Sequence, residues 1–154
     1  MTIWKILALA TVIAATVATA EEQEKKIQRS ELPAAVEKTV AAQSQGATIK
    51  GFSQEKENGQ TYYEAEMTLN GHSKDVLIDP NGNVVEVEEQ VALDSLPTAV
   101  KDGLQAKAGK GKIVKVESLT KHDKLVAYEA KVQTAGKRSE IQVGPDGTPL
   151  DHEE

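Results

Sequence analysis

Cysteine is absent from this 154-residue chain, which excludes disulfides, thiolate metal sites, cysteine nucleophiles and a lipidated N-terminal cysteine. A surplus of basic residues is missing as well. The formal net charge is -6, and lysines and arginines are interleaved with acids, whereas binding to nucleic acid needs clustered basic residues that displace counterions from phosphates. Stability must therefore come from packing, and we expect no nucleic-acid partner.

The sequence also lacks the usual signatures of a catalytic or metal site. No G-x-S-x-G nucleophile elbow is present. The histidines His72, His122 and His152 fall at or near expected turns or at the terminus, without the spacing of converging ligands. The turn that begins at Asp79 starts like a calcium loop, but lacks the glycine and glutamate that such a loop carries at its sixth and twelfth positions. We therefore expect no enzymatic activity, no cofactor and no metal site.

The N-terminal apolar stretch is shorter than the ~20 residues that span a bilayer. One lysine precedes the apolar residues 6–17, and Ala18-Thr19-Ala20 has the small-x-small form of a cleavage site. We interpret residues 1–20 as a signal peptide and expect a periplasmic or secreted protein with no membrane span after cleavage. Residues 21–29 are almost all charged or amide-bearing, so we expect them to form a polar tail.

What the chain does contain is an internal repeat. A helix opening, a central strand and a turn with proline and glycine occur in the same order in both halves. They are SELPAAV at 30–36 and DSLPTAV at 94–100, YEA at 63–65 and 128–130, and the turns Pro80–Gly82 and Pro145–Gly147. We therefore divide the chain into a first repeat at residues 30–88, a linker at 89–93 and a second repeat at 94–154.

Each half begins with a helical pattern and continues with the alternation of a strand. The helical stripes have a four-residue spacing and consist of Leu32, Val36 and Val40 in the first half and Leu96, Val100 and Leu104 in the second. Ser30, and Asp94 or Ser95, can cap these helices. Alternation at residues 62–69 and 126–133 predicts central strands that are covered on one face. The predicted fold class is α+β: two tandem repeats, each one helix followed by an antiparallel β-meander, with the helices packed on one face of the sheet.

The order of these motifs resembles a known family. Leu-Pro-x-Ala-Val at a helix opening, Tyr62-Tyr63-Glu64 in a central strand and the turn Asp79-Pro80-Asn81-Gly82 are similar to PepSY-like, beta-lactamase-inhibitor-like modules of bacterial envelope proteins, in two tandem copies. In the second copy Ala127 replaces the first aromatic residue. The resemblance implies a location outside the cytoplasm and a role in binding or restraining other proteins, such as peptidases. It carries no fixed set of functional residues.

The polar face of the predicted sheet is the remaining candidate for a binding site. Its residues are Tyr62, Glu64, Glu66, Glu129, Lys131 and Gln133. Tyrosine is enriched where partners dock, but charged residues are depleted at interface centres, so an ordinary solvated face remains an open alternative. Our hypothesis is an exported, non-enzymatic protein-binding or inhibitory module whose partner is another envelope or secreted protein. The alternative hypothesis is a cation-responsive periplasmic sensor or buffer protein that uses the acidic surface.

Overall fold

A computed structural model describes residues 23–57, 59–150, 152 and 154, so the predicted signal peptide lies outside the described residues. In this part of the chain eight strands form a single antiparallel sheet in sequence order, accompanied by two helices. The strands are β1 Gln23–Ile27, β2 Thr48–Glu57, β3 Gln60–Leu69, β4 His72–Ile78, β5 Val84–Gln90, β6 Lys112–Lys121, β7 Lys124–Thr134 and β8 Lys137–Val143. The helices are α1 Ala34–Gln43 and α2 Thr98–Ala108, and short 3-10 turns lie at Arg29–Glu31 and Leu93–Ser95.

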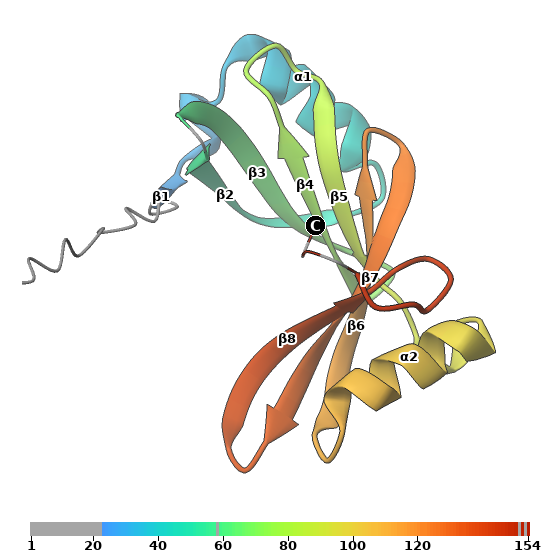
Figure 1. Ribbon diagram of the computed structural model, residues 1–154. Coiled ribbons are helices and arrows are strands. Elements are labelled where there is room, and N and C mark those ends of the chain that lie inside the picture. Colours follow the sequence, from blue (N-terminus) through green and yellow to red (C-terminus); the bar gives the residue numbers. More distant parts are fainter. Residues whose placement is uncertain (1–22, 58, 151, 153) are drawn as a thin grey trace, which may run out of the picture.

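The predicted fold class, two tandem helix-plus-meander repeats, is wrong. Strand β5 pairs with β6, from Glu86 opposite Lys121 to Gln90 opposite Glu117, so the strands of both halves form one continuous sheet. Figure 1 shows this twisted sheet with α1 and α2 toward its two ends. The physical reason is that a meander ending at β5 would leave a row of unpaired backbone N–H and C=O groups, which β6 satisfies.

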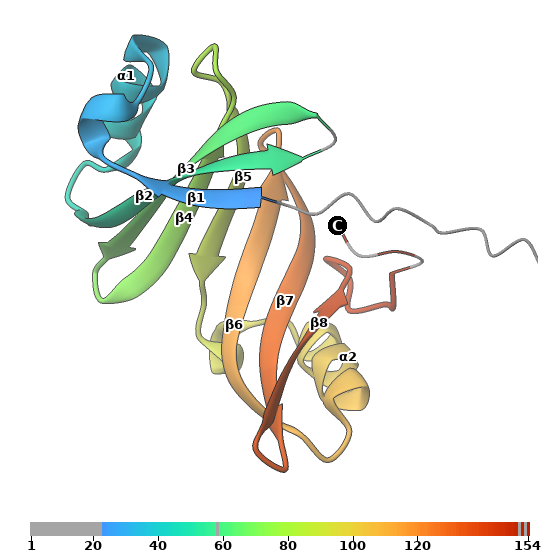
Figure 2. The same cartoon turned by 90° about the vertical axis from the view of Figure 1, so that its left-hand side faces the viewer.

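Strand β1 lies within residues 21–29, where a polar tail was expected. It pairs with β2 along its whole length, and Ile27 stands opposite Phe52, where both side chains are buried. Figure 2 shows β1 lying along β2 at the edge of the sheet. The polar composition of the segment was misleading because an edge strand is held by backbone hydrogen bonds to its neighbour, for which one apolar anchor is enough.

The two helices cover the same face of the sheet. Val36 and Val40 of α1 are buried against the first core cluster, which includes Met67, Val76 and Ile78. In the second cluster Val100 and Leu104 of α2 are buried with Val116, Ala130 and Val143. Val87 of β5 packs on the first cluster and stands opposite Thr120 of β6. Thr120 and Val116 of β6 are four residues apart, so their side chains point to the same face of the sheet. Both core clusters therefore lie on one face. Four residues of the predicted stripes, Val36, Val40, Val100 and Leu104, thus form the buried faces of the helices, whereas Leu32 and Leu96 precede the helices.

The helices begin later than the predicted caps. Pro33 and Pro97 occupy the N-cap positions, and the segments that contain Ser30 and Ser95 form 3-10 turns instead. No helix formed by the described residues has the length and apolar character that crossing a membrane requires.

An acidic open face as candidate binding site

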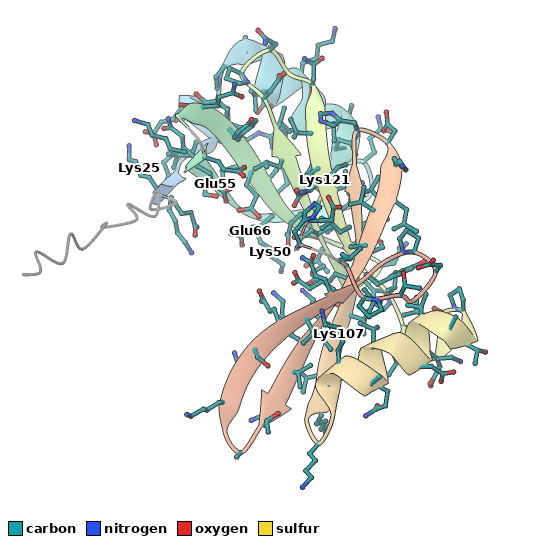
Figure 3. The ribbon with its side chains drawn as sticks, viewed as in Figure 1. Lys25, Lys50, Glu55, Glu66, Lys107 and Lys121 are labelled. Atoms are coloured by element: carbon teal, nitrogen blue, oxygen red, sulfur yellow. The ribbon has the colours of Figure 1, made fainter. Side chains whose placement is uncertain are left out.

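We name the helix-free face of the sheet the open face. Strand alternation and register assign its side chains. From β2 to β8 they include Ser53, Glu55, Tyr62, Glu64, Glu66, Ser73, Asp75, Leu77, Glu86, Glu88, Gln90, Lys115, Glu117, Leu119, Lys121, Glu129, Lys131, Gln133, Arg138, Glu140 and Gln142. Figure 3 shows three of them, Glu55, Glu66 and Lys121, on different strands of this sheet. Carboxylates outnumber cations on this face, which makes it strongly acidic.

The structure places the predicted site residues on the open face, but in two separate groups. Tyr62, Glu64 and Glu66 lie on β3, whereas Glu129, Lys131 and Gln133 lie on β7. The strands β4, β5 and β6 run between them. The Tyr62 hydroxyl donates a hydrogen bond to Gln60 Oε1 over 2.7 Å, and its ring is half-buried rather than fully exposed.

The centre of the open face consists of acids that the sequence analysis did not single out. Asp75 on β4, Glu86 and Glu88 on β5, and Glu117 on β6 fill the space between the two predicted groups. Glutamates alternating with valines at residues 84–88 were a signal for β5. The sequence carried no signal for the alignment of the three strands, because register depends on pairing between distant segments.

This central region is hollowed. A depression of about 420 Å³ is lined by carboxylates, two lysines and Leu77, and the carboxylates include Glu86, Glu88 and Glu154. A smaller one of about 150 Å³ adjoins it and is lined by Glu55, Glu64, Asp75, Leu77, Glu86 and Glu88. The C-terminal Glu154 reaches the rim, where its carboxylate lies 3.9 Å from Lys121 Nζ and its backbone N–H donates to Gln142 Oε1 over 2.8 Å.

Crowding of carboxylates changes their proton affinity. Burial, together with the negative charges of Glu129 and Glu117, raises the pKa of Glu88 to about 8. Burial likewise raises the pKa of Asp75 to about 6, with Glu64 and Glu117 contributing. Desolvation and like charge both disfavour the ionised form of a carboxyl group. The face therefore holds protons near neutral pH that a solvated acid would have released.

Glu117 is the most buried acid of the face, with a relative exposure of 1%. Its Oε1 lies 2.5 Å from Lys115 Nζ and accepts a hydrogen bond from Ser73 Oγ over 3.3 Å. Among the described residues its Oε2 has no hydrogen-bond partner, and Lys131 Nζ lies 3.6 Å away from it. A buried charge is tolerated only when it is paired. Lys115 and Lys131 supply part of that pairing for the carboxylate of Glu117.

Neighbouring polar groups hold the two ends of the face in place. Ser53 is fully buried and its hydroxyl donates to Glu64 Oε2 over 2.9 Å. At the other end Gln142 Nε2 donates to Glu129 Oε2 over 3.0 Å. From the helix side, Lys107 of α2, labelled in Figure 3, donates to the backbone carbonyl of Gln142 over 3.0 Å. Such an array of positioned carboxyl groups can hold protons, bind a cation or pair with basic side chains.

No family model and no curated protein matches the sequence. Solved structures share the fold. A BLIP-like protein from Bacteroides fragilis is 24% identical with a TM-score of 0.58, over 79% of this chain and 85% of that one. A "putative periplasmic" protein from Bacteroides eggerthii is 20% identical with a TM-score of 0.63, over 77% and 86%. A DUF2874 family protein from Bacteroides ovatus is 20% identical with a TM-score of 0.60, over 78% and 85%.

These likenesses define a BLIP-like fold for this chain. They agree with the inhibitor-like part of the predicted resemblance, but they support neither its PepSY-like part nor two tandem copies. The periplasmic description of the Bacteroides eggerthii protein agrees with the location predicted from the sequence.

Proposed function

We propose that this chain is an exported, non-enzymatic protein-binding or inhibitory module of the bacterial envelope, and that its partner docks on the open face. The observation that carries the proposal is the hollowed centre of that face, where carboxylates are held at partial burial by the sheet. The predicted signal peptide and the periplasmic description of a structural neighbour support the location. The fold supports the class, because that neighbour and the BLIP-like protein share it.

The charge of the open face selects for a basic partner. The cations Lys115, Lys121, Lys131 and Arg138 offset only part of the acidic charge, and Lys115 and Lys131 already pair with Glu117. Lysine or arginine side chains that enter the depressions would supply the missing positive charge and replace water around half-buried carboxylates. Complementary charge also accelerates encounter and makes the association rate depend on salt. The partner class is therefore an envelope or secreted protein with an exposed basic loop.

Binding must be tested with a charge reversal on each face. The chain from residue 21 is immobilised, partners are captured from envelope extract, and the affinity of each purified candidate is then measured. Glu66→Lys on the open face should weaken binding at least tenfold and reduce its dependence on salt. Asp102→Lys makes the same charge change at an exposed position of α2 and should leave the affinity unchanged. Equal affinities of the two variants, or a loss only with Asp102→Lys, would show that the open face is not the docking surface.

Binding and inhibition need separate measurements. If the captured partner is an enzyme, such as a peptidase, its activity is assayed with the wild-type chain and with both variants. Inhibition that tracks affinity across the three proteins would establish an inhibitor, whereas tight binding with full enzymatic activity would establish a binding module only.

A further inference from the structure

Strand β8 forms one edge of the sheet. It pairs with β7 alone, whereas β4, which also runs into a proline-containing turn, pairs with strands on both sides. Figure 1 shows β8 as the outermost strand at its end of the sheet. Among the residues that the structure describes, the outer side of β8 is met near its end, where Val143 forms an isolated bridge with Pro149. Residues 137–140 are all exposed, so the outer edge there is available to another strand.

The hairpin turn determines which backbone groups of β8 point outward. Ala135 and Gly136 have φ values of +49° and +81°, the positive pair of a type I′ two-residue turn. Thr134 and Lys137 flank this turn and stand opposite each other, and residues in these two positions hydrogen-bond to each other. Lys137 therefore directs its backbone groups toward β7.

Alternation assigns the rest of the strand. Every second residue after Lys137 also faces β7, whereas Arg138, Glu140 and Gln142 direct their N–H and C=O groups outward. The carbonyl of Gln142 agrees with this assignment, because it accepts a hydrogen bond from Lys107 Nζ of α2 over 3.0 Å. That contact closes the end of the edge, so in the described part of the chain the backbone groups of Arg138 and Glu140 are left open.

We propose that two copies of this chain pair antiparallel along β8, with Arg138 of each copy opposite Glu140 of the other. Backbone hydrogen bonds between the copies require outward residues to stand opposite outward residues. A register that places Arg138 opposite itself, or Glu140 opposite itself, brings like charges together, which destabilises a sheet. The register centred on Ser139 instead pairs opposite charges on both sides of the two-fold axis. The strand is therefore complementary to itself in this register.

The side chains at this edge have room for the pairing. The Glu140 side chain is 59% accessible, and one of its oxygens lies 3.4 Å from Lys131 Nζ. Arg138 is exposed and has no acidic partner within the described residues. A depression of about 360 Å³ beside them is lined by Lys131, Arg138, Ser139 and Glu140. The arginine of a second copy can reach Glu140 there and form a bidentate contact, while Lys131 keeps its contact with Glu117.

A second copy fits this edge better than another strand does. Basic residues on an edge oppose pairing with arbitrary strands, but Glu140 neutralises the Arg138 of an antiparallel copy. Pairing of β8 with β1, the strand at the other edge, would be heterologous and would add chains without closing, whereas a two-fold pair closes. Because residues that stand opposite each other share a face, the open faces of both copies would form one continuous surface.

Sedimentation equilibrium of the chain from residue 21 tests the dimer without a docking partner, so its failure leaves the docking proposal intact. The paired segment is short, and we expect a Kd of about 0.1 mM, in the weak class of specific interfaces. Dimers should therefore dominate at about 1 mM protein and monomers at about 10 μM. A monomer at every concentration up to about 2 mM would overturn the proposal, and so would assemblies that grow past the dimer.

Charge variants test the register. Arg138→Glu and, independently, Glu140→Arg should each weaken dimerisation by about tenfold, because each places like charges opposite one another in both pairs. The double variant should restore dimerisation, since its charges are exchanged and remain opposite. Lys110→Glu makes the same charge change as Arg138→Glu at an exposed loop position and should dimerise like the wild type. Equal affinity in all four variants, or a double variant as weak as the single ones, would contradict the proposed pairing.

Amide hydrogen exchange identifies the paired strand. The N–H groups of Arg138 and Glu140 should exchange about fivefold more slowly at 1 mM than at 10 μM protein, because they are bonded in the dimer alone. The N–H groups of Ser139 and Ile141 face β7 and should be protected at both concentrations. Dimerisation without added protection at Arg138 and Glu140 would place the contact elsewhere and overturn the proposal.

Discussion

Asp75 and Glu88 stand directly opposite each other on β4 and β5, and burial raises the pKa of both, to about 6 and about 8. A sheet gains stability from pairs of opposite charge and loses it from pairs of like charge. This chain therefore carries an unfavourable pair at the centre of its open face. Proteins retain such crowding where a proton, a cation or a partner relieves it.

The first prediction is that stability falls as the pH rises from 5 to 8. In the unfolded chain the pKa values of Asp75 and Glu88 return to the ordinary 3.8 and 4.5. Between these values and the raised ones the folded state holds more protons than the unfolded state, so the free energy of unfolding decreases with pH. One pKa unit corresponds to about 1.4 kcal/mol, and for two partly buried groups we expect a loss of roughly 2 kcal/mol. Urea unfolding at both pH values, with a chelator present, measures it.

Two variants test whether Glu88 causes this pH dependence of stability. Glu88→Gln should remove much of the difference between pH 5 and pH 8, because glutamine does not titrate. Glu89→Gln, on the opposite face of the same strand, should keep the difference. A protein that is equally stable or more stable at pH 8 would contradict the raised pKa values.

The second prediction concerns the buried carboxylate of Glu117. Glu117→Ala removes the shared partner of Lys115 and Lys131. Breaking a buried ion pair costs about 3–5 kcal/mol; here both lysines retain access to water, so we expect about 2 kcal/mol in urea unfolding. Glu140→Ala deletes an exposed partner of Lys131, 59% accessible at its side chain, and should cost less than about 0.5 kcal/mol. Similar losses for the two variants would show that Glu117 is not structurally paired.

The third prediction separates backbone strain from close packing at two glycines. Gly82 has a φ of +88°, and a Cβ there would come 2.7 Å from the carbonyl oxygen of Ala35 in α1. Gly71 has a similar φ of +85°, but within the part of the chain that the structure describes no atom lies within 4 Å of a Cβ at that position. Gly71→Ala should lower the free energy of unfolding by about 1–2 kcal/mol through conformation alone, and Gly82→Ala by at least about 1 kcal/mol more. Equal losses would mean that the turn does not pack against α1.

The fourth prediction tests the helix stripe of α2. Leu104 is fully buried in the second core cluster, and Leu104→Ala should destabilise the protein by about 2–4 kcal/mol through lost burial and a cavity. Val114 is 50% exposed on β6, so Val114→Ala should change stability by less than about 0.5 kcal/mol. Thermal and urea unfolding of both variants should agree. A small effect of Leu104→Ala would place α2 away from the sheet.

Sequence reasoning succeeded where the signal was local. The four-residue spacing of Val100 and Leu104 identified a helix and its buried side, because helix periodicity is a property of consecutive residues. Alternation in β3 and β7 correctly assigned Glu64 and Glu129 to the polar face for the same reason. Strand β1 was not predicted, because its pairing partner β2 follows only after the helix α1. The reasoning failed at the junction of β5 and β6, which merges the two halves into one sheet.

The sequence by itself determined the helices, the alternation of the central strands and the acidic character of their polar face, because each follows from side-chain chemistry repeated at a short period. Only the tertiary structure decided that the strands form one sheet and that Asp75, Glu88 and Glu117 meet at its centre. Their meeting depends on the register of three neighbouring strands. Register is set by backbone pairing between segments far apart in the chain, and a shift of one residue would turn these carboxylates to the helix side.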